Sequence, residues 1–213
     1  WNESKKITLQ NICLYSANGM GVIAQMSEDI FLDGFHTRRR EGYCYSLCAD
    51  ATHFVHCSGV VRVENCTFHG QFDDALNIHG IYTRITDIGT DWIIVREMHP
   101  QTTGIKIYHN GDKVQALNAK TLLPHAEFTV QGVQYLNHQS IKLYLSGDFS
   151  ALKKGDGIEN ISRSATLIFR GNRLEFNRAR GMLIATRGRV LIENNYFCTS
   201  GSAIKFESDG EFW

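Results

Sequence analysis

Two octets decide the fold that this sequence predicts: "LIFRGNRL" at 167–174 and "VLIENNYF" at 190–197. Their first residues lie 23 positions apart, and a repeat length in the twenties is typical of a solenoid, in which each repeat forms one coil. The pattern recurs in "ITLQNICL" from Ile7, "IFLDGFHT" from Ile30 and "VRVENCTF" from Val61. The repeat therefore spans both ends of the chain.

The fifth position of each octet holds only asparagine or glycine. These two residues best tolerate a left-handed backbone, so we expect each coil to turn at this place. The positions are Asn11, Gly34, Asn65, Gly171 and Asn194. A second β-like run follows each octet, and we expect these runs to stack as one parallel sheet. They begin at Gly19, Ala49, Asp73, Arg180 and Gly201.

Leucine-rich repeats have a similar length, but they require an LxxLxLxxN framework and a helical return. The coils here contain short β-runs separated by Asn or Gly turns, which favours an all-β parallel β-helix.

The repeat fails between residues 81 and 162. This interval contains alternating runs such as "DWIIVRE" and "SIKLYL", with turn residues such as Asn110-Gly111 between them, which is typical of a small antiparallel β domain. We therefore predict coils at 1–80, an inserted antiparallel β-barrel at 81–162 and further coils at 163–213. Because the pattern resumes at Leu167, both ends of the insertion are expected to lie close together.

Composition limits the partners. Lys and Arg together number 22, as do Asp and Glu, so no overall field attracts nucleic acid or an acidic membrane surface. No apolar run approaches the roughly 18 residues of a membrane helix.

The six cysteines lack paired CxxC spacing, and we expect buried free thiols, with a Cys57–Cys66 disulfide as the alternative. Because the sequence does not start with Met, we expect an excerpt of a longer protein, with any signal peptide outside it.

Three aspartates are the strongest candidates for chemistry. Asp50 lies one repeat length before Asp73, which is followed directly by Asp74. Neighbouring strands lie about 4.8 Å apart, so these carboxylates should converge, and like charges raise the pKa of at least one of them. A glycosidase needs such a pair, with one carboxyl protonated and one ionised. A calcium site and ordinary capping of turns are the alternatives.

The phrases "ADATHFVHCSG" at 49–59 and "VENCTFHGQFDDALNIHG" at 63–80 resemble the glycoside hydrolase family 110 α-1,3-galactosidases, and the similarity extends over nearly the whole chain. This resemblance implies a right-handed parallel β-helix with an inserted β-barrel. It also implies a secreted bacterial enzyme, extracellular or periplasmic, that removes terminal α-1,3-linked galactose, including that of the blood-group B antigen, with inversion and without cofactor or metal. By matching positions, Asp50 resembles the catalytic acid, and Asp73 and Asp74 resemble the base that holds the water.

Other residues are weaker candidates for binding the sugar, and each has a structural alternative in the core or in a ladder of stacked side chains. They are His53, His56, Asn77, His79 and Trp213. The run Arg38–Arg40 either is a solvated turn or, near the acids, holds a substrate hydroxyl or lowers the pKa of one aspartate.

Two other functions compete with an α-galactosidase: another β-helix polysaccharide hydrolase or lyase, and a β-helix that binds glycans without catalysis. The expected partner is in each case a carbohydrate, with no nucleic acid and no membrane, and a homodimer stays open.

Overall fold

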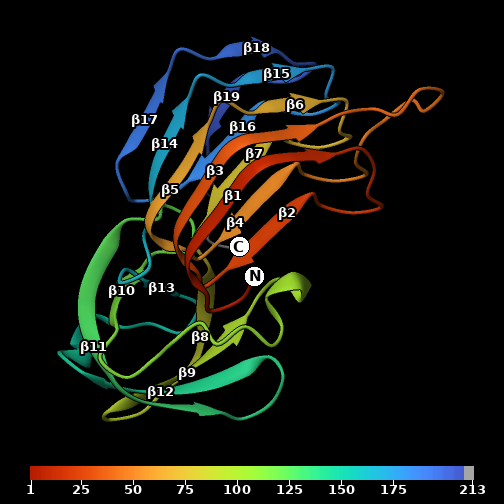
Figure 1. Cartoon of the computed structure of the whole chain (residues 1–213). Helices are drawn as coiled ribbons and strands as arrows, with labels where there is room; N and C mark the ends of the chain where they lie inside the picture. Colours follow the sequence, from red (N-terminus) through yellow and green to blue (C-terminus); the bar gives the residue numbers. More distant parts are fainter. Residues whose placement is uncertain (209–213) are drawn as a thin grey trace. The chain divides into compact units, whose positions relative to one another are not determined.

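The structure, a computed structural model, describes residues 1–208, which form β-strands and two short 3-10 turns (Figure 1). Two compact units divide the chain: Trp1–His79 with Ser164–Glu207, and Gly80–Arg163 with Ser208. Within the described residues, no helix is long and apolar enough to cross a membrane. The predicted all-β class is confirmed.

The first unit consists of two parallel sheets, and the chain alternates between them along its length. One sheet has eight strands, in the order β17-β14-β5-β3-β6-β15-β18 with β1 paired to β3. Its strands are β1 (Lys5–Leu14), β3 (Glu28–Thr37), β5 (Ser58–Glu64), β6 (Thr67–His69), β14 (Thr166–Arg170), β15 (Arg173–Glu175), β17 (Val190–Glu193) and β18 (Tyr196–Cys198).

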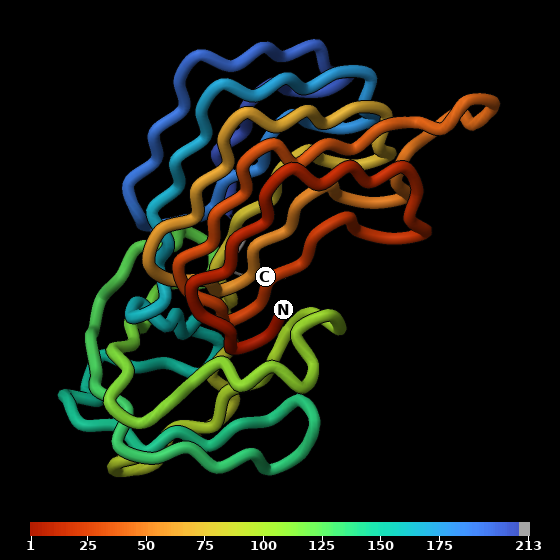
Figure 2. Tube along the Cα trace, in the orientation of Figure 1, coloured from red at the N-terminus to blue at the C-terminus, as the bar shows by residue number. Residues whose placement is uncertain are grey.

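The other sheet has five strands, in the order β19-β16-β7-β4-β2. They are β2 (Val22–Gln25), β4 (Thr52–Val55), β7 (Leu76–His79), β16 (Met182–Ala185) and β19 (Ile204–Phe206). Figure 2 shows how the backbone of successive repeats runs side by side. The register agrees with the repeat read from the sequence, since Ile7 pairs with Ile30 and Leu167 pairs with Val190.

A left-handed residue occurs at the fifth position of every octet, as predicted, with φ between 54° at Asn11 and Asn65 and 66° at Gly171. The structure also explains why Asn and Gly alternate along this row. A Cβ on Gly34 would lie 3.1 Å from Oδ1 of Asn11, and one on Gly171 would lie 3.2 Å from Oδ1 of Asn65. The side chains of Asn11 and Asn65 therefore fill the space beside the neighbouring glycines.

The left-handed residue also interrupts the period-two alternation of each octet. In β5 and β6, Val61 and Val63 are buried before the turn, and Cys66 and Phe68 are buried after it. The inward positions of an octet are thus the first, third, sixth and eighth. Together with Phe54 and Ile78 from the five-stranded sheet, these side chains form one continuous apolar core.

The cysteine expectation is only partly right. All six thiols are free, but only Cys57 and Cys66 are buried. The exposed ones are Cys13, Cys44, Cys48 and Cys198. Cys13 occupies the seventh position of its octet, which points away from the core, whereas Cys66 occupies the sixth.

The second unit is a closed antiparallel barrel of strand order β10-β11-β12-β9-β8-β13. The strands are β8 (Tyr82–Ile88), β9 (Trp92–Glu97), β10 (Lys113–Leu117), β11 (Pro124–Tyr135), β12 (Ser140–Ser146) and β13 (Gly157–Asn160), with 3-10 turns at Pro100–Thr102 and Phe149–Ala151. The first and last strands are neighbours, because Tyr82 pairs with Glu159. Both ends of the insertion therefore lie close together, as expected.

The two parallel sheets continue after the barrel without a change of order. Strand β14 pairs with β5, and β16 pairs with β7. In addition, Oδ1 of Asn172 accepts a hydrogen bond of 2.8 Å from the backbone N–H of Cys66. Segments from before and after the barrel thus form one packed unit.

A candidate active site of three aspartates

Asp50, Asp73 and Asp74, called the carboxylate cluster below, lie just before two neighbouring strands of the five-stranded sheet. Strand β4 begins at Thr52 and β7 begins at Leu76, and these two residues are paired. One carboxylate oxygen from each aspartate lies within 4.8 Å of those of the other two. The parallel pairing therefore brings together the acids that the repeat predicted to converge.

Asp74 is completely buried and forms an ion pair with Arg180, which lies just before β16. Arg180 Nε donates to Oδ1 and Nη2 donates to Oδ2, each at 2.9 Å, and the Arg180 backbone N–H adds a bond of 3.0 Å to Oδ1. Burial raises the pKa of Asp74, and the guanidinium opposes this effect. A two-pronged contact of this kind favours the ionised carboxylate.

Arg180 is not among the site residues predicted from the sequence, although it begins one of the second β-like runs. A signal was present. Leu76 pairs with Met182, so Asp74 and Arg180 occupy the same position in adjacent coils and carry opposite charges.

Asp50 is almost fully buried, and both of its carboxylate oxygens are bound. Oδ2 lies 2.5 Å from Nδ1 of His53, and Oδ1 accepts a 3.1 Å bond from the backbone N–H of Asp74. When His53 carries its proton on Nδ1, both contacts are donors to the Asp50 carboxylate, and donors of this kind favour its ionised form.

Asp73 differs from its two neighbours. Its Oδ1 accepts a 3.1 Å bond from the backbone N–H of Asp74, but no cationic side chain of residues 1–208 forms an ion pair with it. Burial raises the pKa of Asp73, and the nearby charges of Asp50 and Asp74 raise it further. Among the three, Asp73 is the carboxyl best placed to keep a proton.

Of the histidines predicted to bind sugar, His53 contacts Asp50 of the cluster and His79 contacts His53, whereas His56 follows the other end of β4. His53 uses Nδ1 for Asp50, and its Nε2 lies 3.0 Å from Nε2 of His79, with the two rings edge to face. Neither ring nitrogen of His53 is left for a sugar hydroxyl. His56 is buried, with φ of 53°, and its backbone N–H donates to the carbonyl of His79.

Asn77 pairs with His53 across β4 and β7, so the two side chains are neighbours on one face of the sheet. Only 7% of Asn77 is exposed, and its Oδ1 has no hydrogen-bond partner within the described part of the chain. It remains a candidate sugar ligand. Trp213 lies outside the described residues. In the Arg38–Arg40 run, the guanidinium carbon of Arg39 lies 6.0 Å from the centre of the Phe176 ring. Within residues 1–208, none of these three arginines forms an ion pair with the cluster.

The cluster is the only group of acidic, histidine or cysteine side chains in residues 1–208 with spacing suited to a metal ion. Its ligands would be carboxylate oxygens, which suit a hard divalent cation. However, the Arg180 guanidinium already binds both oxygens of Asp74. Arg180 thus supplies the positive charge that a cation would otherwise supply.

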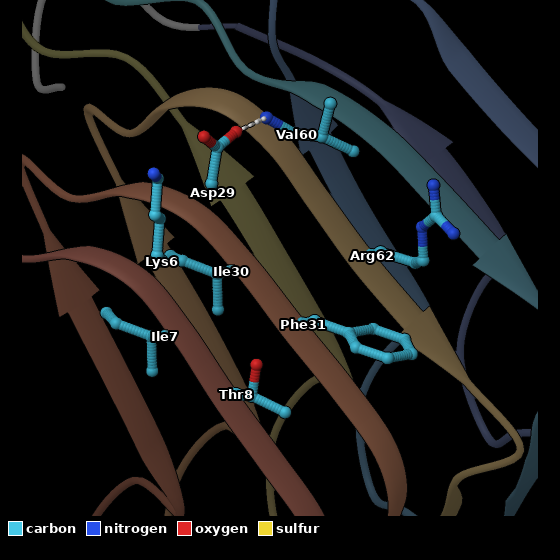
Figure 3. A pocket seen from close by; sticks show the side chains of 8 residues that line it. All are labelled: Lys6, Ile7, Thr8, Asp29, Ile30, Phe31, Val60 and Arg62. Carbon is cyan, nitrogen blue, oxygen red and sulfur yellow. Dashed lines mark hydrogen bonds between the residues drawn. The ribbon is translucent and has the colours of Figure 1, made fainter.

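A separate hollow lies on the outer surface of the eight-stranded sheet, across β1, β3 and β5 (Figure 3). Its lining includes Lys6, Phe31 and Arg62, and Asp29 Oδ1 accepts a 3.1 Å bond from the backbone N–H of Val60. None of the predicted site residues lines it.

Comparison with known proteins shows what the chain is similar to in sequence. Residues 92–158 match the family model described as GLAA-B beta-barrel domain II. Alpha-1,3-galactosidase A of Shewanella woodyi is 35% identical over 99% of the chain, and alpha-1,3-galactosidase B of Akkermansia muciniphila is 32% identical over 99%. Alpha-1,3-galactosidase B of Parabacteroides distasonis is 35% identical over 97%. The chain is homologous to the α-1,3-galactosidases.

The resemblance to α-1,3-galactosidases that the sequence predicted is thereby confirmed. The similarity includes the segments that carry the carboxylate cluster as well as the barrel, because it covers nearly the whole chain. The chain spans 35%, 27% and 36% of the length of these three α-1,3-galactosidases, in the order given above.

Proposed function

We propose that this chain carries the catalytic groups of a glycoside hydrolase that releases terminal α-1,3-linked galactose from glycans. One observation carries the proposal: three carboxylates lie within 4.8 Å of one another in three different electrostatic environments. Glycoside hydrolysis requires one protonated and one ionised carboxyl at the scissile bond, and such differences in environment separate those roles.

The geometry supports a different division of roles from the one that the resemblance implied. Asp50 has a histidine partner and Asp74 has an arginine partner, and both contacts favour the ionised form. Asp73 has a raised pKa and lacks such a partner among the described residues. We therefore propose that Asp73, and not Asp50, donates the proton to the leaving oxygen, while Asp50 and Asp74 hold and deprotonate the attacking water.

Several finer features belong to the same proposal and follow the resemblance. The reaction inverts the anomeric centre, so galactose appears first as the β-anomer. The substrates are blood-group B-type glycans and linear α-1,3-galactosides, the enzyme acts outside the cytoplasm, and it needs no metal. The two parallel sheets wind as a right-handed parallel β-helix.

Matched aspartate variants test the roles. The protein is assayed at its natural length, because the curated relatives are much longer than this chain. Asp73→Asn should slow hydrolysis of a galactosyl-α-1,3-galactose disaccharide by about 10² to 10⁴-fold and spare an α-galactoside with an activated phenolate leaving group, which needs no proton. Asp50→Asn and Asp74→Asn should slow both substrates alike, and Asp91→Asn, an exposed aspartate of the barrel, is the control.

The opposite pattern, in which only Asp50→Asn spares the phenolate substrate, would restore the roles implied by the resemblance. Release of α-galactose first, detected by NMR, would contradict inversion. Loss of activity in EDTA that calcium restores would make the cluster a metal site. If the protein releases no galactose from either glycan, the proposed function itself is wrong.

A further inference from the structure

Asp50 of the carboxylate cluster and two buried histidines form a continuous hydrogen-bonded line, which runs from Asp50 through His53 to His79. The line consists of Asp50 Oδ2, His53 Nδ1 at 2.5 Å, and then His53 Nε2 facing His79 Nε2 at 3.0 Å. The three residues are 4%, 3% and 8% exposed. Water therefore competes little for these contacts, and each group depends on its neighbour for its proton.

The proton positions along this line follow from its geometry. Two ring nitrogens at hydrogen-bond distance share one proton. With Nδ1–H of His53 donating to the Asp50 carboxylate, either His79 donates to a neutral His53, or a charged His53 donates to His79. In both arrangements the Nδ1–H of His53 points to Asp50. When His79 donates from Nε2, a neutral His53 carries its proton on Nδ1, so the contact between the two histidines reinforces the direction set by Asp50.

We propose that His53 is a positioning residue for Asp50, and that His79 fixes the tautomer of His53, so that the two imidazoles hold the Asp50 carboxylate ionised and in one direction. This inference rests on the proposed function for its catalytic consequence. It goes beyond the earlier expectation that both histidines bind sugar hydroxyls. With Oδ2 bound by His53 and Oδ1 bound by the Asp74 backbone N–H, Asp50 has no freedom to rotate away from the cluster.

Substitution of each histidine by Asn and by Gln provides a matched test of these contacts. The amide nitrogen of Asn takes the place of Nδ1 of histidine, and the amide nitrogen of Gln takes the place of Nε2. His53→Asn keeps a donor toward Asp50 and should retain kcat within about 10-fold of the unmodified protein. His53→Gln removes that donor and should lower kcat by about 100-fold with KM nearly unchanged, since a displaced catalytic group costs this much. His79 contacts His53 through Nε2, so the expectation for His79 is the opposite one: His79→Gln should retain more activity than His79→Asn.

A measurement without substrate separates this inference from the proposed function. In ¹⁵N NMR spectra of the unmodified protein, His53 should be protonated at Nδ1, and His79→Asn should weaken that preference while His79→Gln preserves it. Thermal unfolding confirms that each variant is folded. If the protein hydrolyses no α-galactoside, the proposed function fails while the spectra still decide the tautomer.

Three results would overturn the inference. The first is equal activity of His53→Asn and His53→Gln. The second is a large rise in KM with kcat unchanged in either variant, because a sugar ligand behaves in this way. The third is an Nε2-protonated His53 in the unmodified protein.

Discussion

Asp74 and Arg180 lie 106 positions apart in the sequence and form a two-pronged ion pair, in which Nε and Nη2 are each 2.9 Å from a different carboxylate oxygen. The barrel sequence lies between them, so this contact depends on the return of the chain to the parallel sheets. It also sets the charge balance of the cluster, because Arg180 is the only cationic side chain of residues 1–208 that pairs with Asp74.

Arg180→Gln should destabilise the first unit. Asp74 would keep a buried charge without its partner, and breaking a buried pair costs about 3–5 kcal/mol. Because the side chain of Arg180 is 32% exposed, we expect a smaller loss of about 2 kcal/mol in the free energy of unfolding, measured in urea. Adding Asp74→Asn should recover part of the loss. Arg178→Gln is the control, and an equal loss there would contradict this reading.

Glu97 should make the stability of the barrel depend on pH. It is 3% exposed, its partner is the Thr102 hydroxyl at 3.5 Å, and burial raises its pKa to about 7. The folded state thus binds a proton more tightly than the unfolded state. The contribution of Glu97 to the free energy of unfolding is fully present below its unfolded pKa of about 4.5. This contribution decreases by about 3 kcal/mol as the pH rises through 7.

Hydrogen exchange of the β9 amides at about pH 5 and about pH 8 measures this effect. Glu97→Gln should remove most of the difference, whereas Glu127→Gln, on the exposed side of β11, should leave it unchanged. A barrel that becomes more stable toward pH 8 would show that Glu97 is ionised in the folded state.

Gly171→Ala should cost about 1–2 kcal/mol of stability, because φ is 66° and the new Cβ would lie 3.2 Å from Oδ1 of Asn65. Gly19→Ala is the matched control, since a Cβ there meets no atom within 4 Å. Combining Gly171→Ala with Asn65→Gly should relieve the contact but not the backbone strain. Equal melting temperatures for Gly171→Ala and Gly19→Ala would argue against the role of the left-handed row.

Thiol labelling should distinguish two groups of cysteines. Four exposed thiols should react quickly with an aromatic disulfide reagent, and two should react only after unfolding. Burial raises the pKa of the Cys66 thiol to about 12, so almost no reactive thiolate is present there. Mass spectrometry of the labelled peptides identifies the sites. Rapid labelling of Cys66 in the folded protein would contradict its place in the core.

The sequence predicted the features that depend on local spacing. The period of 23 residues gave the pairing of Leu167 with Val190, and the Asn or Gly at the fifth position gave the left-handed row. The convergence of Asp50 with Asp73 and Asp74 followed from the same alignment, because residues one repeat apart occupy neighbouring strands.

Features that depend on side-chain direction were not predicted. The orientation of Cys13 away from the core required knowing that the left-handed residue shifts the alternation within the octet. The edge-to-face contact of His53 and His79 depends on rotamers, and the sequence left both as candidate sugar ligands. The Asp74–Arg180 pair required alignment of two coils across the barrel insertion.

The pairing of Tyr82 with Glu159 at the two ends of the barrel has a consequence for the order of folding. Strand β14 must find β5 across 106 positions, the separation of the paired residues Val60 and Thr166, whereas β1 and β3 pair across 23 positions and β3 and β5 across 31. If the intervening chain were flexible, closing the longer loop would cost roughly 1 kcal/mol more and slow the search. A barrel that folds first shortens this loop to about the length of one ordinary coil, because only residues 61–79 and 164–165 then separate the two paired positions. Early folding of the barrel is therefore expected to speed the joining of the two halves of the parallel sheets.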